Sequence, residues 1–242
     1  MEPFATGPRP APRTLRVLAR LLGYPDATLR AHLPELRTAL HAEAALSADG
    51  LAGLDALIGA LERQDPLDTE AEYVRLFDSG RRTALHLFEH VHGDSRERGP
   101  AMIDLARTYE QAGVYLAAGE MPDHLPVVLE FASTQPAAEA SAFLREIAHL
   151  VNHIRAALEQ HGSRYASVMA ALLELASVPA QPVALAAEES PDASWQEPAA
   201  FGGCAAAGPA GGVAGGVAAP QPVHFVRTRR RAARPAAGEI GP

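Results

Sequence analysis

Three polar residues in one short stretch of the chain could form part of a metal site. The five residues from His86 to His90 fit the pattern H-x-x-E-H, in which two histidines one helical turn apart ligate zinc and the glutamate activates water. A hydrolytic site of this kind also needs a third protein ligand and a substrate cleft. The candidates for that ligand have no recognisable motif around them: His124, His149 and His153.

The alternative interpretation is that these histidines form hydrogen bonds at a helix end. His92 enlarges the cluster, but structural zinc is uncommon in a domain whose only cysteine is Cys204. Cys204 lies in a Gly/Ala stretch where nothing nearby would lower the pKa of its thiol, so we expect it to be inert. The sequence therefore predicts no catalytic residue, no metal and no cofactor, and a metal-dependent hydrolase using His86, Glu89 and His90 is kept as the alternative.

A run of mixed charges follows the histidines. Asp94, Arg96, Glu97 and Arg98 lie between two glycines, Gly93 and Gly99. Such a run is either a solvated loop or a set of carboxylate and guanidinium groups that fixes one loop conformation. Both interpretations remain open on the sequence alone.

The charge of the chain is unevenly distributed. All 21 basic residues are arginine, and the formal net charge is −8. Residues 1–220 carry 16 arginines against 28 acidic residues, whereas residues 221–242 carry five arginines against one glutamate. An acidic body disfavours nucleic acid, because affinity for it comes largely from neutralising phosphates, and favours a basic partner through long-range attraction.

The N-terminal residues lack the apolar run of a secretory signal, so we expect a cytoplasmic protein. No window approaches 18 consecutive strongly apolar residues without charge, which predicts that the chain does not insert into a membrane.

Leucines recur at helical spacing along most of the chain, beginning with Leu15, Leu18 and Leu22. Glycine, proline and capping residues interrupt the pattern, which predicts an all-α, bundle-like domain of roughly eight helices over residues 14–179. We expect residues 1–13 to be flexible. Residues 180–242 are rich in Ala, Gly and Pro and end in a basic stretch, and we expect them to be a disordered tail.

Three local patterns bear on where the helices begin and end. Residues 85–92 alternate like a strand but also share a helix face, and the absence of partner strands favours a helix. Pro34 either opens a new helix or kinks an existing one. Asp123 precedes a helical pattern with Pro126 in its first turn, which predicts that Asp123 caps this helix.

The same stretches carry a resemblance to a known family. Residues 76–80 read L-F-D-x-G, residues 85–99 read L-x-L-F-E-H-V-H-G-D-S-R-E-R-G, and residues 122–126 read P-D-H-L-P. Together they resemble the NarJ family, the delta subunit or molybdenum cofactor assembly chaperone of respiratory nitrate reductase, within the wider TorD and DmsD chaperone superfamily. The resemblance covers residues 14–178 densely and the tail sparsely. The sequence departs from the family pattern at His86 and Pro100.

The resemblance implies an all-helical, cytoplasmic, non-catalytic chaperone. Such a protein would bind the N-terminal segment of the nitrate reductase catalytic (alpha) subunit, support insertion of the molybdenum cofactor and time membrane assembly. It would be absent from the finished enzyme, and proteins of molybdenum cofactor biosynthesis are possible further partners. A basic amphipathic helix that lies in an apolar groove with an acidic rim would suit the charge of the body.

The signature stretches and the charged run supply the residues that we expect to contact this partner. The apolar members would line the groove and the polar members would surround it. The full set is Tyr73, Phe77, Asp78, Phe88, Glu89, His90, His92, Asp94, Arg96, Arg98, Asp123, His124, Leu125 and Leu129.

Overall fold

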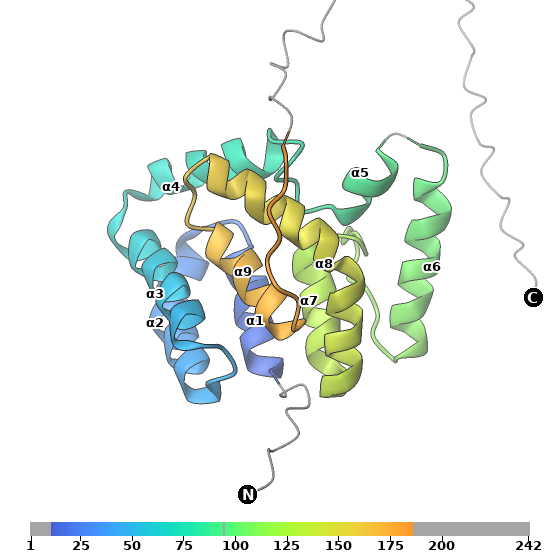
Figure 1. Cartoon of the computed structure of the whole chain (residues 1–242), viewed down its shortest axis with the longest axis horizontal. Helices are drawn as coiled ribbons and strands as arrows, with labels where there is room; N and C mark the ends of the chain where they lie inside the picture. Colours follow the sequence, from blue (N-terminus) through green and yellow to red (C-terminus); the bar gives the residue numbers. More distant parts are fainter. Residues whose placement is uncertain (1–10, 94, 186–242) are drawn as a thin grey trace, which may run out of the picture. The chain divides into compact units, whose positions relative to one another are not determined.

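The computed structural model describes residues 11–93 and 95–185, and these are helical over most of their length (Figure 1). The described part contains nine α-helices and one π-helical turn, η1, and no strand. The predicted all-α class is confirmed, with nine helices in place of roughly eight. In chain order the elements are α1 (Pro12–Leu21), α2 (Ala27–Glu43), α3 (Ala48–Arg63), α4 (Pro66–Tyr73), η1 (Val74–Asp78), α5 (Leu87–His92), α6 (Arg98–Gln111), α7 (Leu125–Thr134), α8 (Ala137–Gln160) and α9 (Ala166–Leu175).

Some of the sequence-based predictions concern residues outside this part. Asp94, Cys204, the tail from residue 186 onward and the first ten residues lie outside the described residues. None of the described helices is long and apolar enough to cross a bilayer.

The core is built around α1, which packs against α7 on one side and α2 on the other, while α8 pairs with α9 (Figure 1). Leu15, Leu18 and Leu22 are at most 2% exposed, as their helical spacing predicts. Leu125 and Leu129 of α7 are fully buried in the same core. The periodic leucines therefore form the interior of the domain.

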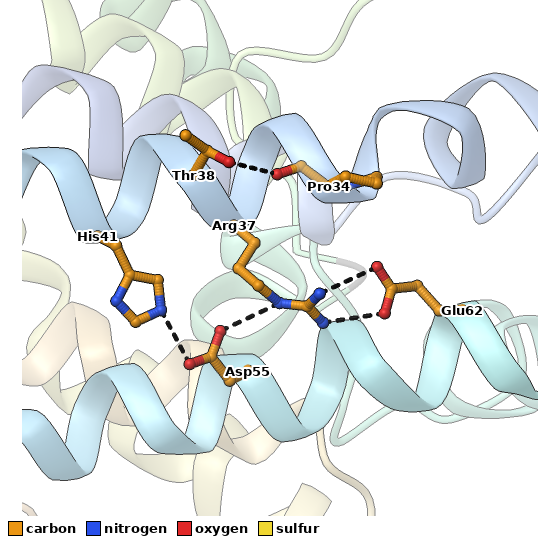
Figure 2. A network of polar contacts seen from close by, with 6 residues as sticks. All are labelled: Pro34, Arg37, Thr38, His41, Asp55 and Glu62. Carbon is orange, nitrogen blue, oxygen red and sulfur yellow. Dashed lines mark hydrogen bonds and ion pairs between the residues drawn. The ribbon is translucent and has the colours of Figure 1, made fainter.

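Helices α2 and α3 are joined at their surface by a polar network (Figure 2). The Arg37 guanidinium donates to both carboxylate oxygens of Glu62, at 3.2 and 3.0 Å, and its Nε lies 3.3 Å from Asp55 Oδ1. His41 Nε2 lies 2.9 Å from Asp55 Oδ2. Pro34 is inside α2 and does not end it, and the Thr38 hydroxyl donates to the Pro34 carbonyl.

Helix α6 is attached to the domain mainly through one side chain. Tyr109 is the single buried residue among its 14 residues. The Tyr109 hydroxyl donates to the Pro122 carbonyl at 2.8 Å, and its ring lies 4.4 Å from that of Phe131 in α7. The other residues of α6 are exposed or half-buried.

An extended segment follows α9 and runs along α8 (Figure 1). Buried Asn152 holds it with two hydrogen bonds: its side-chain nitrogen donates to the Gln181 carbonyl at 2.9 Å, and its side-chain oxygen accepts from the Gln181 amide at 3.1 Å. Gln181, which the sequence assigned to the tail, thus has defined contacts with α8.

Candidate functional site

A cleft of about 650 Å³ lies between α1, α2 and α7. It begins where α1 ends and is bounded by the start of α2 and by the first turns of α7. Its lining residues are Ala19, Arg20, Gly23, Tyr24, Asp26, Thr28, Leu29, His32, Glu35, Leu36, Glu120, His124, Pro126, Val127 and Glu130.

The cleft combines apolar and acidic side chains. Leu29, Leu36, Pro126 and Val127 supply apolar surface. Four carboxylates and one arginine carry its charge, together with two histidines: Asp26, Glu35, Glu120, Glu130, Arg20, His32 and His124. An apolar surface with an excess of carboxylates suits a ligand that is both apolar and basic.

A second hollow of about 360 Å³ continues the cleft along α1 and α7. The two hollows share Arg20, Glu120, Val127 and Glu130. Tyr115, which is 76% exposed, lines the second hollow. The shared walls make one elongated cleft, a shape suited to a length of peptide.

Two residues near helix starts, Asp26 and Pro126, determine where the helices beside this cleft begin. Asp26 Oδ1 accepts from the Leu29 amide at 2.7 Å and caps α2. Pro126 lies in the first turn of α7, where a missing amide hydrogen costs no helical hydrogen bond. These two residues fix where α2 and α7 begin, and therefore where the cleft ends.

Asp123 performs a different task from the one predicted. It does not cap α7, whose N-cap residue is His124. Its fully buried carboxylate instead accepts from the Phe88 amide at 3.1 Å and lies 3.3 Å from His86 Nδ1, at the start of α5. The correction has a physical reason: the first turn of α5 has no cap from its own sequence, and Asp123 supplies one from across the fold.

The backbones on either side of Asp123 also pair. The Leu87 amide donates to the Asp123 carbonyl at 3.0 Å, and the Leu125 amide donates to the Leu85 carbonyl at 2.8 Å. The result is an isolated antiparallel bridge between His86 and His124. The strand-like and helical features of residues 85–92 are therefore both real, because one bridging residue precedes α5.

The rings of His86 and His124 stack at 4.9 Å beside this bridge. The hydrogen bond to Asp123 raises the pKa of His86, partly opposed by burial. Burial, followed by the nearby His86, lowers the pKa of His124. The pKa values of the two stacked rings are therefore shifted in opposite directions, and the shift at His124 favours the neutral ring in the cleft.

The zinc-site interpretation fails on geometry. His86 precedes α5 in an extended conformation, so His86 and His90 are not on one helix face. His90 Nε2 is 2.8 Å from the Ala84 carbonyl, and its ring lies next to His153. Within residues 11–93 and 95–185, no three His, Cys, Asp or Glu side chains converge in a way that could hold a metal ion.

Tyr73 and Phe77 are buried, at 7% and 6% exposure, and belong to an aromatic cluster. The Tyr73 hydroxyl donates to the Leu22 carbonyl at 2.8 Å, and burial raises its pKa to about 12. The two rings pack against Tyr165. Asp78, at the end of η1, is exposed. With Leu125 and Leu129 fully buried, four of the apolar residues expected at the partner surface build the core instead.

The remaining predicted residues lie around α5. Phe88 and His92 are half-buried, with their rings 5.5 Å apart. Arg98 pairs with Glu89 at 3.4 Å, and both side chains are partly exposed. Arg96 is exposed and has no hydrogen-bond or ion-pair partner among the described residues.

Of the residues that line the cleft, His124 alone is among the partner contacts predicted from the sequence. The other lining residues come from α1, α2 and the loop between them, and from α7 and the loop before it, about 90 residues further along the chain. The sequence feature that could have indicated the cleft is an acidic residue on the exposed face of each of two apolar helices: Glu35 in α2 and Glu130 in α7.

Comparison with known proteins places this architecture in a family. Residues 25–171 match the family model described as "Nitrate reductase delta subunit". The chain is 45% identical over 163 residues to the nitrate reductase molybdenum cofactor assembly chaperone NarJ of Escherichia coli strain K12, covering 67% of this chain and 69% of that protein. It is 31% identical to a Bacillus subtilis strain 168 protein named "Probable nitrate reductase molybdenum cofactor assembly chaperone NarJ", covering 66% and 86%. The chain belongs to the nitrate reductase delta subunit family.

Proposed function

We propose that this protein is a cytoplasmic assembly chaperone for respiratory nitrate reductase. It binds the N-terminal segment of the catalytic subunit and keeps that subunit competent for insertion of the molybdenum cofactor. It also delays membrane assembly until insertion is complete and is absent from the finished enzyme. Proteins of molybdenum cofactor biosynthesis would meet the complex while the chaperone is bound.

Family membership supports the chaperone role, because the relatives are named as cofactor assembly chaperones and not as catalysts. The observation that carries the proposed binding mode is the elongated cleft with its apolar surface and four carboxylates. A basic amphipathic helix would place its apolar face on Leu36 and Val127 and its cationic side chains near Glu35 and Glu130. The acidic body would attract such a segment from a distance.

Binding of the full chain to a synthetic peptide that covers the first ~20 residues of the catalytic subunit tests this proposal; as a helix, such a peptide spans about 30 Å. Isothermal titration should show one site. Val127→Asp, which places a charge on the half-buried apolar surface of the cleft, should abolish binding. A matched change at an exposed apolar residue outside the cleft, Ile103→Asp in α6, should leave it intact. Absence of binding by the unmodified protein, or equal binding by Val127→Asp, would overturn the proposal.

A further inference from the structure

A further apolar hollow, of about 450 Å³, lies beside the cleft along α4 and η1. Three of the large apolar side chains that are exposed in the described part of the chain line it: Leu67 at 74%, Tyr24 at 47% and Val74 at 39%. Leu67, Ala71 and Val74 follow one another at helical spacing, so they form one stripe along the helix surface.

This stripe differs from the scattered apolar residues of an ordinary protein surface. Single exposed leucines are common on folded proteins, whereas several large apolar side chains converging on one hollow indicate a contact surface. The aromatic core beneath is already complete, because buried Tyr73 packs against Phe77 and Tyr165. Leu67 and Val74 are not part of the hydrophobic core.

The hollow adjoins the cleft at Tyr24, whose side chain lines both. Two contacts hold this side chain in place. Its hydroxyl donates to Glu70 Oε2 at 2.9 Å, and its ring makes an edge contact with Tyr73 at 5.6 Å. Tyr24 is thus a fixed divider between two adjoining apolar surfaces.

The balance of charge differs on the two sides of Tyr24. The cleft has four carboxylates against one arginine. The hollow has one carboxylate and one guanidinium: Glu70, which accepts a hydrogen bond from the Tyr24 hydroxyl, and Arg75, which is exposed without a partner among the described residues. The cleft favours a cationic ligand, whereas the hollow offers a guanidinium group to a carboxylate.

We infer that the segment bound in the cleft continues past Tyr24 into the hollow, where an aliphatic side chain packs between Leu67 and Val74 and a carboxylate pairs with Arg75. This inference rests on the proposed function and extends its site. The occupant is therefore one peptide with a basic amphipathic part and an adjoining part that carries an aliphatic and an acidic residue. Contacts on both sides of Tyr24 would fix the register of the segment, which the cleft alone would leave free to slide.

Titration of a synthetic peptide covering the first ~30 residues of the nitrate reductase catalytic subunit tests the extension, since this length reaches beyond a cleft-sized helix. Leu67→Ser and Val74→Ser should each weaken binding about fivefold to tenfold. This loss of affinity corresponds to the burial free energy of roughly one or two methylene groups. Ile103→Ser and Val91→Ser, at residues of similar exposure on α6 and α5, should bind like the unmodified protein. All four changes are at the surface, and melting temperatures would verify that each variant folds.

Charge reversal gives the second arm. Arg75→Glu should weaken binding about as much as Leu67→Ser, and peptides with each acidic residue replaced in turn by arginine should include one that restores the affinity. If Val127→Asp abolishes binding but the hollow variants do not weaken it, the extension is wrong and the proposed function stands. If the unmodified protein does not bind the peptide, both fail.

Discussion

Asp123 Oδ2 lies 3.1 Å from the backbone nitrogen of Phe88, a residue 35 positions earlier in the chain. This hydrogen bond joins the start of α5 to the residue that precedes the N-cap of α7, and the same carboxylate holds His86. Asp123 is fully buried, so its removal would leave the Phe88 amide without an acceptor in a water-poor site. The family signature residues on either side of this contact are therefore coupled through one side chain.

Asp123→Ala should lower the free energy of unfolding by about 2–4 kcal/mol, the combined cost of a lost helix cap and a lost buried acceptor. Denaturant titration followed by circular dichroism measures the change. Asp78→Ala is the matched control, because this aspartate is exposed and has no hydrogen-bond or ion-pair partner among the described residues. Similar losses in both variants would show that the contact has no special role.

Protonation of His86 should stabilise the fold. The Asp123 hydrogen bond raises the pKa of His86 above its unfolded value of about 6.5, so its contribution is complete below that pH and is lost as pH rises through the folded pKa. The difference in free energy of unfolding between the unmodified protein and His86→Gln should therefore be larger at pH 6 than at pH 8.5. Glu89 and Arg98 also act on this ring, with opposite signs.

His124 should show the opposite behaviour, because burial lowers its pKa and acidification below about 6.5 costs stability. His124→Gln should therefore relieve part of the acid sensitivity. Proton NMR titration of the two rings provides an independent measurement, with each signal assigned by its absence in the corresponding variant. A His86 midpoint below that of His124 would contradict the assigned geometry.

The leucine pattern predicted the helices well because burial repeats locally along a helix, as at Leu15, Leu18 and Leu22. The same pattern could not separate core from groove, since Leu125 and Leu129 have the spacing expected of either. Caps supplied from across the fold leave no local signal, which is why Asp123 was assigned to α7 and not to α5. The cleft also leaves no local signal, because it forms between α1 and α2 near the start of the chain and the distant α7.

The Gly80 of the signature is required by close packing. A Cβ at this position would lie 2.5 Å from the Leu76 carbonyl oxygen, which also accepts from the Thr83 hydroxyl. Gly80→Ala should therefore destabilise the domain by about 1–3 kcal/mol, the usual cost of overpacking. Gly99→Ala is the control: no atom would approach the added methyl within 4 Å, and alanine favours the helix, so we expect a gain of up to about 1 kcal/mol. Thermal denaturation would reveal the opposite signs.

The Arg37 network between α2 and α3 should contribute modestly and depend on salt (Figure 2). Its side chains are about one third exposed, so Glu62→Gln should cost up to about 1 kcal/mol at low ionic strength. Most of this difference should disappear in 1 M NaCl, where the Debye length is about 3 Å. A loss that salt leaves unchanged would indicate that the Glu62 side chain acts through packing.

The two kinds of side chain in the cleft should control different rates of peptide binding. Glu35→Arg and Glu130→Arg should slow association several-fold, because exposed carboxylates attract a basic segment before contact, whereas Leu36→Ala and Val127→Ala should mainly speed dissociation. Raising salt to 0.15 M, where the Debye length is about 8 Å, should slow association of the unmodified protein and change dissociation little. Stopped-flow kinetics with the peptide of the first ~20 residues, about 30 Å as a helix, measures both rates, and Glu110→Arg in α6 controls for net charge. A dissociation rate that rises with salt as steeply as association falls would mean that charge, and not apolar contact, holds the segment in the cleft.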